Sequence, residues 1–251
     1  MPVILKSPRE IQKMRQSGQV VRQVLDAVRQ QVKPGATTMD LERVAEETMR
    51  QLGATPAFKG YHDYPCVLCT SVNSEVVHGI PSDKRELKAG DIVSIDTGVV
   101  LDGYYADSAI TVPVGEDEQL DDKTRRLLEV TQKSLEKGIA AAQVGARLGD
   151  IGAAVQQVVE AEGFSVVREF VGHGIGTHLH EEPQVPNYGK RGQGLKLQAG
   201  MVLAIEPMVN AGNPSVRVLG DKWTAVTTDG SLSAHFEHCV AVTADGPQIL
   251  T

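Results

Sequence analysis

The chain has 251 residues, of which 41% are hydrophobic and 23% charged, and its formal net charge is −7. This length gives one large domain or two small ones an ample core. An acidic chain without a cluster of lysines and arginines excludes nucleic acid as a specific partner, and no apolar run approaches the roughly 20 residues of a membrane span.

The first predicted helix begins at Ser7-Pro8-Arg9-Glu10, a capping box with proline at the first helical position. Apolar residues follow helical spacing from Ile11 to Val28, and Lys33-Pro34-Gly35 ends the helix. Because the N-terminus leads directly into this helix, the sequence does not indicate a signal peptide. Three cysteines, an odd number, fit a reducing compartment, so we expect a cytoplasmic protein.

The remaining elements alternate between helices and strands. Further helices are predicted at about 38–52, 118–142 and 148–162. A hairpin around Leu101-Asp102-Gly103 is expected to join two of the strands. Strands are predicted near 65–70, 91–100, 104–112, 165–171, 201–210, 215–219, 223–228 and 235–243. This order predicts an α+β fold with a mostly antiparallel sheet covered by helices.

Two segments of the chain, 110 residues apart, resemble each other. The segment from Lys88 to Asp96 reappears as the one from Gln198 to Glu206, each with a glycine turn and a short apolar strand that ends on a carboxylate. Earlier in each copy, 35–41 aligns without gaps on 145–151. No flexible linker separates the copies. We therefore predict a single catalytic domain over 1–251, made of pseudo-two-fold related halves at about 1–115 and 116–251.

Four carboxylates are expected to converge between these halves. Asp96 and Asp107 lie eleven residues apart on the two arms of the hairpin, and we expect them side by side at one level. Glu206 corresponds to Asp96 in the second half, and Glu237 lies on a strand that corresponds to the one bearing Asp107. Four buried acids cannot all stay ionised without compensation. Two divalent cations balance four negative charges, which predicts a dinuclear centre with metals about 3.5–4 Å apart.

Histidines complete the predicted centre. His173 lies in a glycine-rich turn, Gly172-His173-Gly174-Ile175-Gly176, where the backbone approaches a site closely. His78 occupies a similar position in the first half, and His180 lies in an inserted segment, 177–195, that breaks the equal spacing of the halves. Carboxylates with an imidazole suit Mn, Fe(II), Co or Zn. The remaining histidines are interpreted as structural or as lying behind the ligands, namely His62, His178, His235 and His238.

The cysteines do not indicate a metal site of their own. Cys66 and Cys69 form a C-x-x-C pair without a second pair, so a zinc ribbon or a redox motif is weakly supported.

Taken together, these motifs resemble the type I methionine aminopeptidases, in their minimal bacterial form, over residues 5 to 250. The order and spacing of His78-Gly-Ile-Pro, Asp96 with Asp107, Gly172-His173-Gly, His180-Glu-Glu-Pro, Ile205-Glu206-Pro and Phe236-Glu237-His238 are those of that family. The resemblance implies the pita-bread fold. It also implies two metal ions (Co, Mn, Fe or Zn) held by Asp96, Asp107, His173, Glu206 and Glu237.

The resemblance implies a metal-dependent hydrolase, an aminopeptidase that removes the initiator methionine from nascent proteins and peptides. A metal-bridging water would attack the first peptide bond, and Glu206 would take its proton. His180 would steady the developing oxyanion, and His78 would hold the substrate amide. Tyr64, Cys69 and Trp223 match positions of the methionine pocket. We expect a monomer that meets peptide N-termini near the ribosome and binds no membrane.

Two alternatives share this fold. An Xaa-Pro aminopeptidase or dipeptidase would carry a similar set of ligands, usually with a further N-terminal domain. A non-catalytic binding member would typically lose ligands, and all five are present here. One departure from the family pattern is Leu179, where many members carry an aromatic residue before the histidine. We expect Leu179 to make that wall of the pocket smaller and less aromatic.

Overall fold

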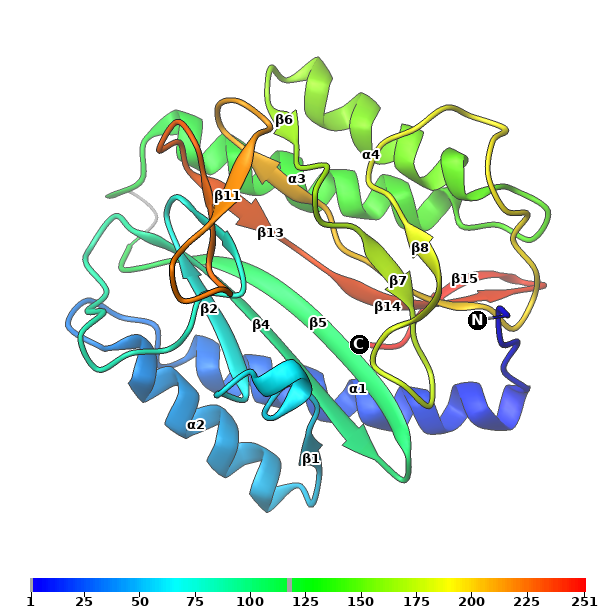
Figure 1. The fold of residues 1–251 in the computed structure, drawn as a ribbon, viewed down its shortest axis with the longest axis horizontal. Coiled ribbons are helices and arrows are strands. Elements are labelled where there is room, and N and C mark those ends of the chain that lie inside the picture. Colours follow the sequence, from blue (N-terminus) through cyan, green and yellow to red (C-terminus); the bar gives the residue numbers. More distant parts are fainter. Residues whose placement is uncertain (1, 117–118) are drawn as a thin grey trace.

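Two pairs of helices flank a set of antiparallel strands (Figure 1). The structure, a computed structural model, describes residues 2–116 and 119–251. Its α-helices are α1 (Pro8–Arg29), α2 (Thr38–Gln51), α3 (Asp122–Ala141) and α4 (Leu148–Ala161), and η1 (Tyr61–Asp63) is a 3₁₀ turn. In the described parts of the chain, no helix is both long enough and apolar enough to cross a membrane.

The predicted helices are confirmed, with small changes at their ends. The capping box of α1 forms, because the Ser7 amide donates to the Glu10 carboxylate (2.8 Å) while the Ser7 hydroxyl accepts from the Glu10 amide (3.4 Å). This helix ends at Arg29, four residues before Lys33. The predicted start of the third helix at 118 lies outside the described residues, and the helix runs from Asp122.

The longest strands form the predicted hairpin, β4 (Ile92–Leu101) with β5 (Tyr104–Pro113), and the pairings between the strands are antiparallel. The other strands of the first half are β1 (Thr55–Pro56), β2 (Leu68–Val72) and β3 (Glu75–Val77). Those of the second half are β6 (Ser165–Val166), β7 (Gly172–Gly174), β8 (Glu181–Val185), β9 (Val202–Ile205), β10 (Met208–Asn210), β11 (Val216–Val218), β12 (Ala225–Thr227), β13 (Ser233–His235), β14 (His238–Thr243) and β15 (Gly246–Ile249).

Several predicted strands were wrong in extent. The strand predicted at 65–70 begins only at Leu68, and the one at 165–171 ends at Val166. The strands predicted at 201–210 and 235–243 are each broken in two, the first at Glu206-Pro207 and the second at Phe236-Glu237. Proline has no amide hydrogen for a ladder, which accounts for the first break. Short strands β1, β3, β7, β8 and β15 were not predicted, and β7 forms where a glycine-rich turn was expected.

At these breaks the chain passes from one sheet into another. β9 pairs with β14 and β10 pairs with β13, so both long segments pass from one sheet into another at the broken positions. β14 also lies beside β5 of the first half, where the Glu237 amide donates to the Ala109 carbonyl (2.9 Å) and the Ser108 hydroxyl donates to the Glu237 carbonyl (2.5 Å). The central hairpin of the first half and its counterpart in the second half therefore meet directly.

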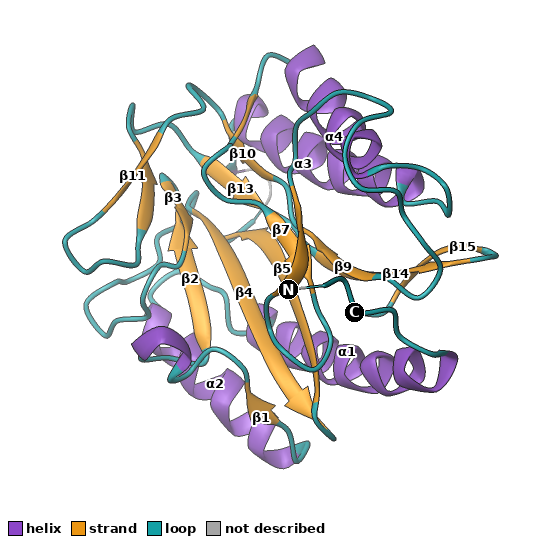
Figure 2. Ribbon diagram, turned by 45° about the vertical axis from the view of Figure 1, so that its right-hand side comes forward, coloured by secondary structure: helices purple, strands orange, loops and turns teal. Residues whose placement is uncertain are grey.

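The helices decide which face of the hairpin remains open for chemistry. Val93, Ile95 and Val99 of β4 are fully buried in the core that includes α1 and α2 (Figure 2). Because side chains alternate along a strand, Asp96 and Gly98 point to the opposite face. That face is where β7, β9 and the segment before β14 approach.

Candidate metal centre

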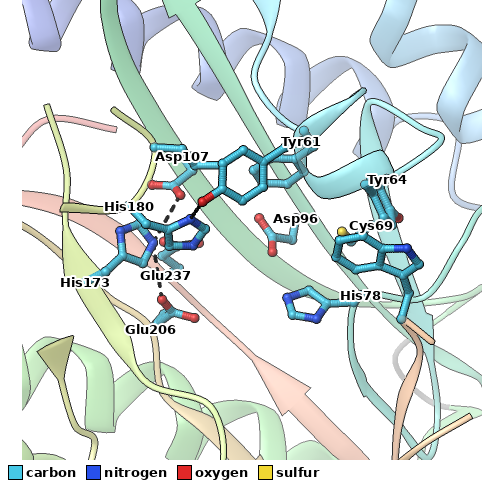
Figure 3. Close-up of a pocket in the computed structure, with 13 residues that line it drawn as sticks. Tyr61, Tyr64, Cys69, His78, Asp96, Asp107, His173, His180, Glu206 and Glu237 are labelled. Carbon is cyan, nitrogen blue, oxygen red and sulfur yellow. Dashed lines mark hydrogen bonds and ion pairs between the residues drawn. The ribbon is translucent and has the colours of Figure 1, made fainter. Parts of the chain in front are cut away.

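One cavity of about 630 Å³, including its open mouth, collects the residues predicted from the sequence. Figure 3 shows Asp107, His173 and Glu206 at one side and Tyr64 with Cys69 at the other, with Asp96 and His78 between them. The cavity is lined by Phe58, Tyr61, Tyr64, Cys69, His78, Asp96, Asp107, His173, Leu179, His180, Glu206, Trp223 and Glu237. All ten predicted ligand, catalytic and pocket residues are therefore brought together, and their roles stay predictions.

The two aspartates share one face of the hairpin, but not one level. Asp96 pairs with Ala109 and Asp107 pairs with Gly98, so the acids are diagonal neighbours offset by one pair of residues on that face. The expectation of a side-by-side pair was wrong, because Leu101 pairs with Tyr104 across a two-residue turn, Asp102-Gly103, and this turn position places Asp96 opposite Ala109. Gly98 leaves room for this arrangement, since a β-carbon there would lie 3.2 Å from the Asp107 Cβ.

The two glutamates lie at the chain breaks described above. Glu206 follows β9 directly, and the buried Asn187 amide donates to its backbone carbonyl (3.0 Å). Glu237 lies between β13 and β14 and is 3% exposed. A side chain at the end of a strand is free of the in-and-out alternation, so it can turn toward the aspartates of the other half.

His173 connects the acids from β7. Its Nε2 lies 3.5 Å from an Asp107 oxygen and 3.6 Å from a Glu206 oxygen. Its Nδ1 lies 2.9 Å from the Gly174 carbonyl, which accepts a hydrogen bond when Nδ1 carries the proton. That tautomer leaves the Nε2 lone pair directed at the acids, as in histidines that bind metals. Ligand atoms of Asp107, His173 and Glu237 all lie within 4.8 Å of one another.

The electrostatics of the acids call for a positive charge. Burial, followed by repulsion from neighbouring carboxylates, raises the pKa of Asp96 and of Glu237 well above their ordinary values. Burial raises the pKa of Glu206 to about 8. Burial acts in the same sense on Asp107, but hydrogen bonding and attraction to His173 hold the pKa of Asp107 below its ordinary value.

The donor set fits a divalent cation. A buried oxygen of Asp96, Oδ1, has no hydrogen-bond partner, which is costly for an acid unless a ligand outside the chain completes it. Four carboxylates and one imidazole are hard to borderline ligands, of the kind that Mn, Fe(II), Co and Zn accept. Asp107, His173 and Glu237 form the tightest part of this buried Asp/His/Glu site.

Two further histidines face the centre without joining it. The Tyr61 hydroxyl lies 2.8 Å from His180 Nδ1, and the His180 ring lies 4.2 Å from the His173 ring between centroids. Burial, reinforced by the charge on His173, lowers the pKa of His180 to about 4. Burial lowers the pKa of His78 to about 4 as well. Both rings are therefore neutral at neutral pH and can each offer one N–H to a substrate.

The far end of the cavity is apolar and rigid. The Tyr64 hydroxyl lies within hydrogen-bond distance of two backbone carbonyl oxygens, those of Leu68 (2.8 Å) and Gly79 (3.1 Å). The Tyr64 ring meets the Trp223 ring edge-on, with centroids 5.0 Å apart. Cys69 adds a buried thiol, and burial raises its pKa well above the ordinary value, so it stays protonated.

Sequence reasoning missed Phe58 and Tyr61, which also line the cavity. A compositional signal was present, since the chain has only ten aromatic residues and three of them fall between 58 and 64. These two rings add aromatic surface to the cavity wall, to which Leu179, 3% exposed, contributes only an aliphatic side chain.

The histidines interpreted as structural lie outside the cavity lining. His62 and His178 are exposed, and His238 Nδ1 lies 2.9 Å from the Thr251 hydroxyl. His235 is buried behind the centre, with Nε2 3.8 Å from a Glu206 oxygen.

Comparisons with known proteins agree with this geometry. The family model of metallopeptidase family M24 matches residues 12–244. A methionine aminopeptidase of Clostridium perfringens is 52% identical over 249 residues, which are 99% of this chain and 98% of that protein. The crystal structure of a methionine aminopeptidase from Thermotoga maritima has a TM-score of 0.97 and 48% identity, covering 100% of this chain and 99% of the other.

A prolidase from Pyrococcus horikoshii is less similar. Its crystal structure has a TM-score of 0.76 at 25% identity, and the match covers 99% of this chain but only 63% of the prolidase. The resemblance indicated by the sequence motifs, and the α+β pita-bread fold that it implied, are confirmed. The chain belongs to metallopeptidase family M24 and, within it, to the bacterial type I methionine aminopeptidases.

Proposed function

We propose that this chain is a metal-dependent aminopeptidase that removes the initiator methionine from peptides and nascent proteins. The observation that carries the proposal is the arrangement of the cavity, in which the metal-type donors extend from one side to Asp96 in the middle, and Tyr64 and Cys69 form an apolar end at the other side. The two methionine aminopeptidases described above are named for this activity, and they match the chain over nearly its whole length.

We further propose that Asp96, Asp107, His173, Glu206 and Glu237 hold two divalent ions, of Mn, Fe(II), Co or Zn. Two such ions balance the charge of four carboxylates, and the orphaned Asp96 oxygen supports a ligand on its side of the site. When bound, the ions supply Lewis acidity that polarises the peptide carbonyl and acidifies water.

The chain's own residues then perform the proton transfers and the positioning. Glu206 accepts the proton of the attacking water at its carboxylate, which bound cations would keep ionised and available as a base. His180 is neutral and offers an N–H to the developing oxyanion, and the Tyr61 hydroxyl orients its ring. His78, also neutral, holds the substrate amide near the leaving nitrogen.

The apolar end selects the first side chain. A thioether is flexible and polarisable, and it packs well against the edges of aromatic rings and against a thiol. Tyr64, Cys69 and Trp223 provide such walls, and Phe58 and Tyr61 also line the cavity. Leu179 removes one aromatic contact, so we propose that selection against other unbranched side chains, such as norleucine, depends mainly on these rings.

The setting of the activity is part of the proposal. We propose a monomer in the cytoplasm that meets N-termini as they leave the ribosome, and a single catalytic domain whose halves cover about 1–115 and 116–251. The central contact between β5 and β14 supports one domain over two.

Turnover of two peptides tests the proposal. Chelated enzyme would be assayed on Met-Ala-Ser and Ala-Pro-Ser, with and without added Mn(II) or Co(II). Metal-dependent release of methionine with the proline peptide intact is expected. Cleavage of Ala-Pro-Ser instead would place the chain with the proline-directed members, and cleavage of neither peptide under any metal would favour a binding role.

A further inference from the structure

A buried ion pair joins the N-terminal segment to the loop that carries His180. Lys6 Nζ lies 2.5 Å from a Glu181 carboxylate oxygen, and both side chains are about 95% buried, with exposures of 4% and 5%. The pair connects positions 175 residues apart. The other ion pairs of the described residues that involve no histidine have at least one exposed partner.

The Lys6 end of the pair is fixed by the backbone around it. Its amide donates to the Gly200 carbonyl (2.7 Å), and its ammonium also donates to the Ile4 carbonyl (3.1 Å). Ser7, the next residue, is the N-cap of α1. The lysine is therefore held between the turn that precedes β9 and the first turn of a long helix.

The Glu181 end organises the loop from Gly176 to Glu181. While Oε2 accepts from Lys6, Oε1 accepts from the backbone amides of Thr177 (2.8 Å) and His178 (3.2 Å). The loop is packed tightly against the lysine, because a β-carbon at Gly176 would collide with Lys6 Cε.

The same loop delivers two side chains to the cavity. Leu179 and His180 both line it, and His180 immediately precedes Glu181. Outside the loop, the His180 ring is fixed by the hydrogen bond between its Nδ1 and the Tyr61 hydroxyl (2.8 Å). The position of the ring thus depends on how the loop is held.

We propose that Lys6 and Glu181 are positioning residues for His180, so that the N-terminal segment sets the geometry of the active site. This inference rests on the proposed function, in which His180 contacts the substrate. Without Lys6, the Glu181 carboxylate would be a buried charge without its counter-charge, which is strongly unfavourable. The carboxylate would turn toward solvent, and the amides of Thr177 and His178 would lose their acceptor.

The main test is a pair of substitutions at Lys6 and His180. Lys6→Met keeps the length and packing of the side chain but removes its charge, and we expect kcat on a Met-Ala-Ser peptide to fall about 10- to 100-fold, with bound metal unchanged. If Lys6 acts through His180, Lys6→Met lowers kcat no further in a His180→Ala background. Multiplying losses in the double variant would overturn the proposal, because a general loss of structure affects both backgrounds equally.

A neutral pair provides the rescue. In the variant Lys6→Met with Glu181→Gln, the glutamine carbonyl oxygen can still accept from the loop amides without a buried charge. We expect kcat to recover at least about fivefold over Lys6→Met alone, since removing both charges avoids the unpaired carboxylate. No recovery would contradict the proposed mechanism. If Lys6→Met fails to fold, Glu181→Gln alone, compared in wild-type and His180→Ala backgrounds, provides the same test.

The control is Arg126→Met, which breaks a half-exposed ion pair between α3 and α4 (Glu162, 2.5 Å), and we expect kcat to stay within about twofold of wild type.

Amide hydrogen exchange gives a readout that does not depend on activity. Faster exchange at Thr177 and His178 in Lys6→Met, but not in Arg126→Met, is expected. Unchanged exchange at these amides would overturn the proposal. Because exchange can be measured even if the wild-type enzyme released no methionine, failure of this proposal can be told apart from failure of the proposed function.

Discussion

At the scale of single residues, the centre is defined by acids that are unfavourable without a ligand. Asp107 is the member of the set that His173 keeps ionised, and it lies within the tightest group of donors. Such a residue is expected to be indispensable for holding a cation, whereas an aspartate elsewhere on the same hairpin should be replaceable.

Asp107→Ala is therefore expected to lose bound metal and activity together. We expect a drop in kcat/KM of about 100-fold or more, since even residues behind the ligands cost 10- to 100-fold. Metal content by elemental analysis and turnover of a methionyl peptide measure both effects. Asp102→Asn, in the exposed turn of the same hairpin, is the matched control and should retain both. Loss of activity with full metal content would contradict the assignment of Asp107 as a ligand.

Tyr61 gives a second prediction at this scale. Tyr61→Phe keeps the ring in the cavity wall but removes the hydroxyl that lies 2.8 Å from His180 Nδ1. We expect kcat to fall about 10-fold, with KM and metal content little changed, because the His180 ring loses the partner that orients it. The control is Tyr104→Phe, whose hydroxyl contacts Glu10 (3.2 Å) away from the cavity. An effect on KM alone would indicate that Tyr61 serves only as a wall of the pocket.

At the scale of elements, the sequence predicted the helices and the central hairpin well, because these depend on local patterns. Helical spacing defined α1 and α2, with a capping box at the start of α1, and a glycine turn defined the bend between β4 and β5. The acids that follow apolar runs were also visible, since Ile95 and Ile205 lead directly to Asp96 and Glu206. Only Glu206 lies at a strand end, however, because β4 continues past Asp96 to Leu101.

What local patterns could not predict is where a strand changes partner. The apolar run 201–210 has the composition of one strand, but its first part pairs with β14 and its second part with β13. The offset between Asp96 and Asp107 was missed for a similar reason, since the register of the hairpin depends on where its turn lies. Phe58 and Tyr61 were missed because a loop without periodicity gives no sign of where its side chains point.

Gly98 provides the prediction for this scale. A β-carbon there would lie 2.9 Å from the Phe58 ring and 3.1 Å from the Ala57 Cβ, besides approaching Asp107. Gly98→Ala is expected to cost about 1–3 kcal/mol in the free energy of unfolding and to lower metal affinity, because the wall and the ligand must shift apart. Denaturant unfolding and metal titration measure the two effects. Gly220→Ala, with no atom within 4 Å of the added carbon, should change neither.

At the scale of the whole molecule, the metal centre lies where the two halves meet. Asp96 and Asp107 come from the first half, while His173, Glu206 and Glu237 come from the second. A cation held by all five would cross-link the halves, in addition to the hydrogen bonds between β5 and β14. Ligands that bind only the folded state stabilise it by mass action, so the centre should matter for folding as well as for catalysis.

The last prediction concerns pH and metal removal. In the metal-free protein, burial raises the pKa of Glu206 from its ordinary 4.5 to about 8, and Asp96 and Glu237 shift in the same direction. A raised pKa in the folded state means that the folded form binds more protons than the unfolded form. The stability from these protonated acids is fully present below about pH 4.5 and is lost as pH rises toward 8.

His173 acts in the same sense. Burial lowers its pKa, but Asp107 and Glu206 more than offset this and raise the pKa from 6.5 to about 9. Its contribution is present below pH 6.5 and is lost as pH rises toward 9. The metal-free protein should therefore lose on the order of a few kcal/mol between pH 5.5 and 8. Bound cations keep the acids ionised and His173 neutral, so the metal-loaded protein should not show this loss.

Thermal unfolding with EDTA or with Mn(II) at pH 5.5 and pH 8 measures the difference. We expect the increase in Tm caused by metal to be clearly larger at pH 8, because stabilisation by the cation grows as protons cease to compete for the same carboxylates. A single transition is expected in each condition, since the halves share the centre. An equal increase in Tm at both pH values would mean that the acids do not hold protons in the metal-free fold. Glu206→Gln, which cannot ionise, should reduce the pH dependence of the EDTA-treated protein by the share that Glu206 contributes.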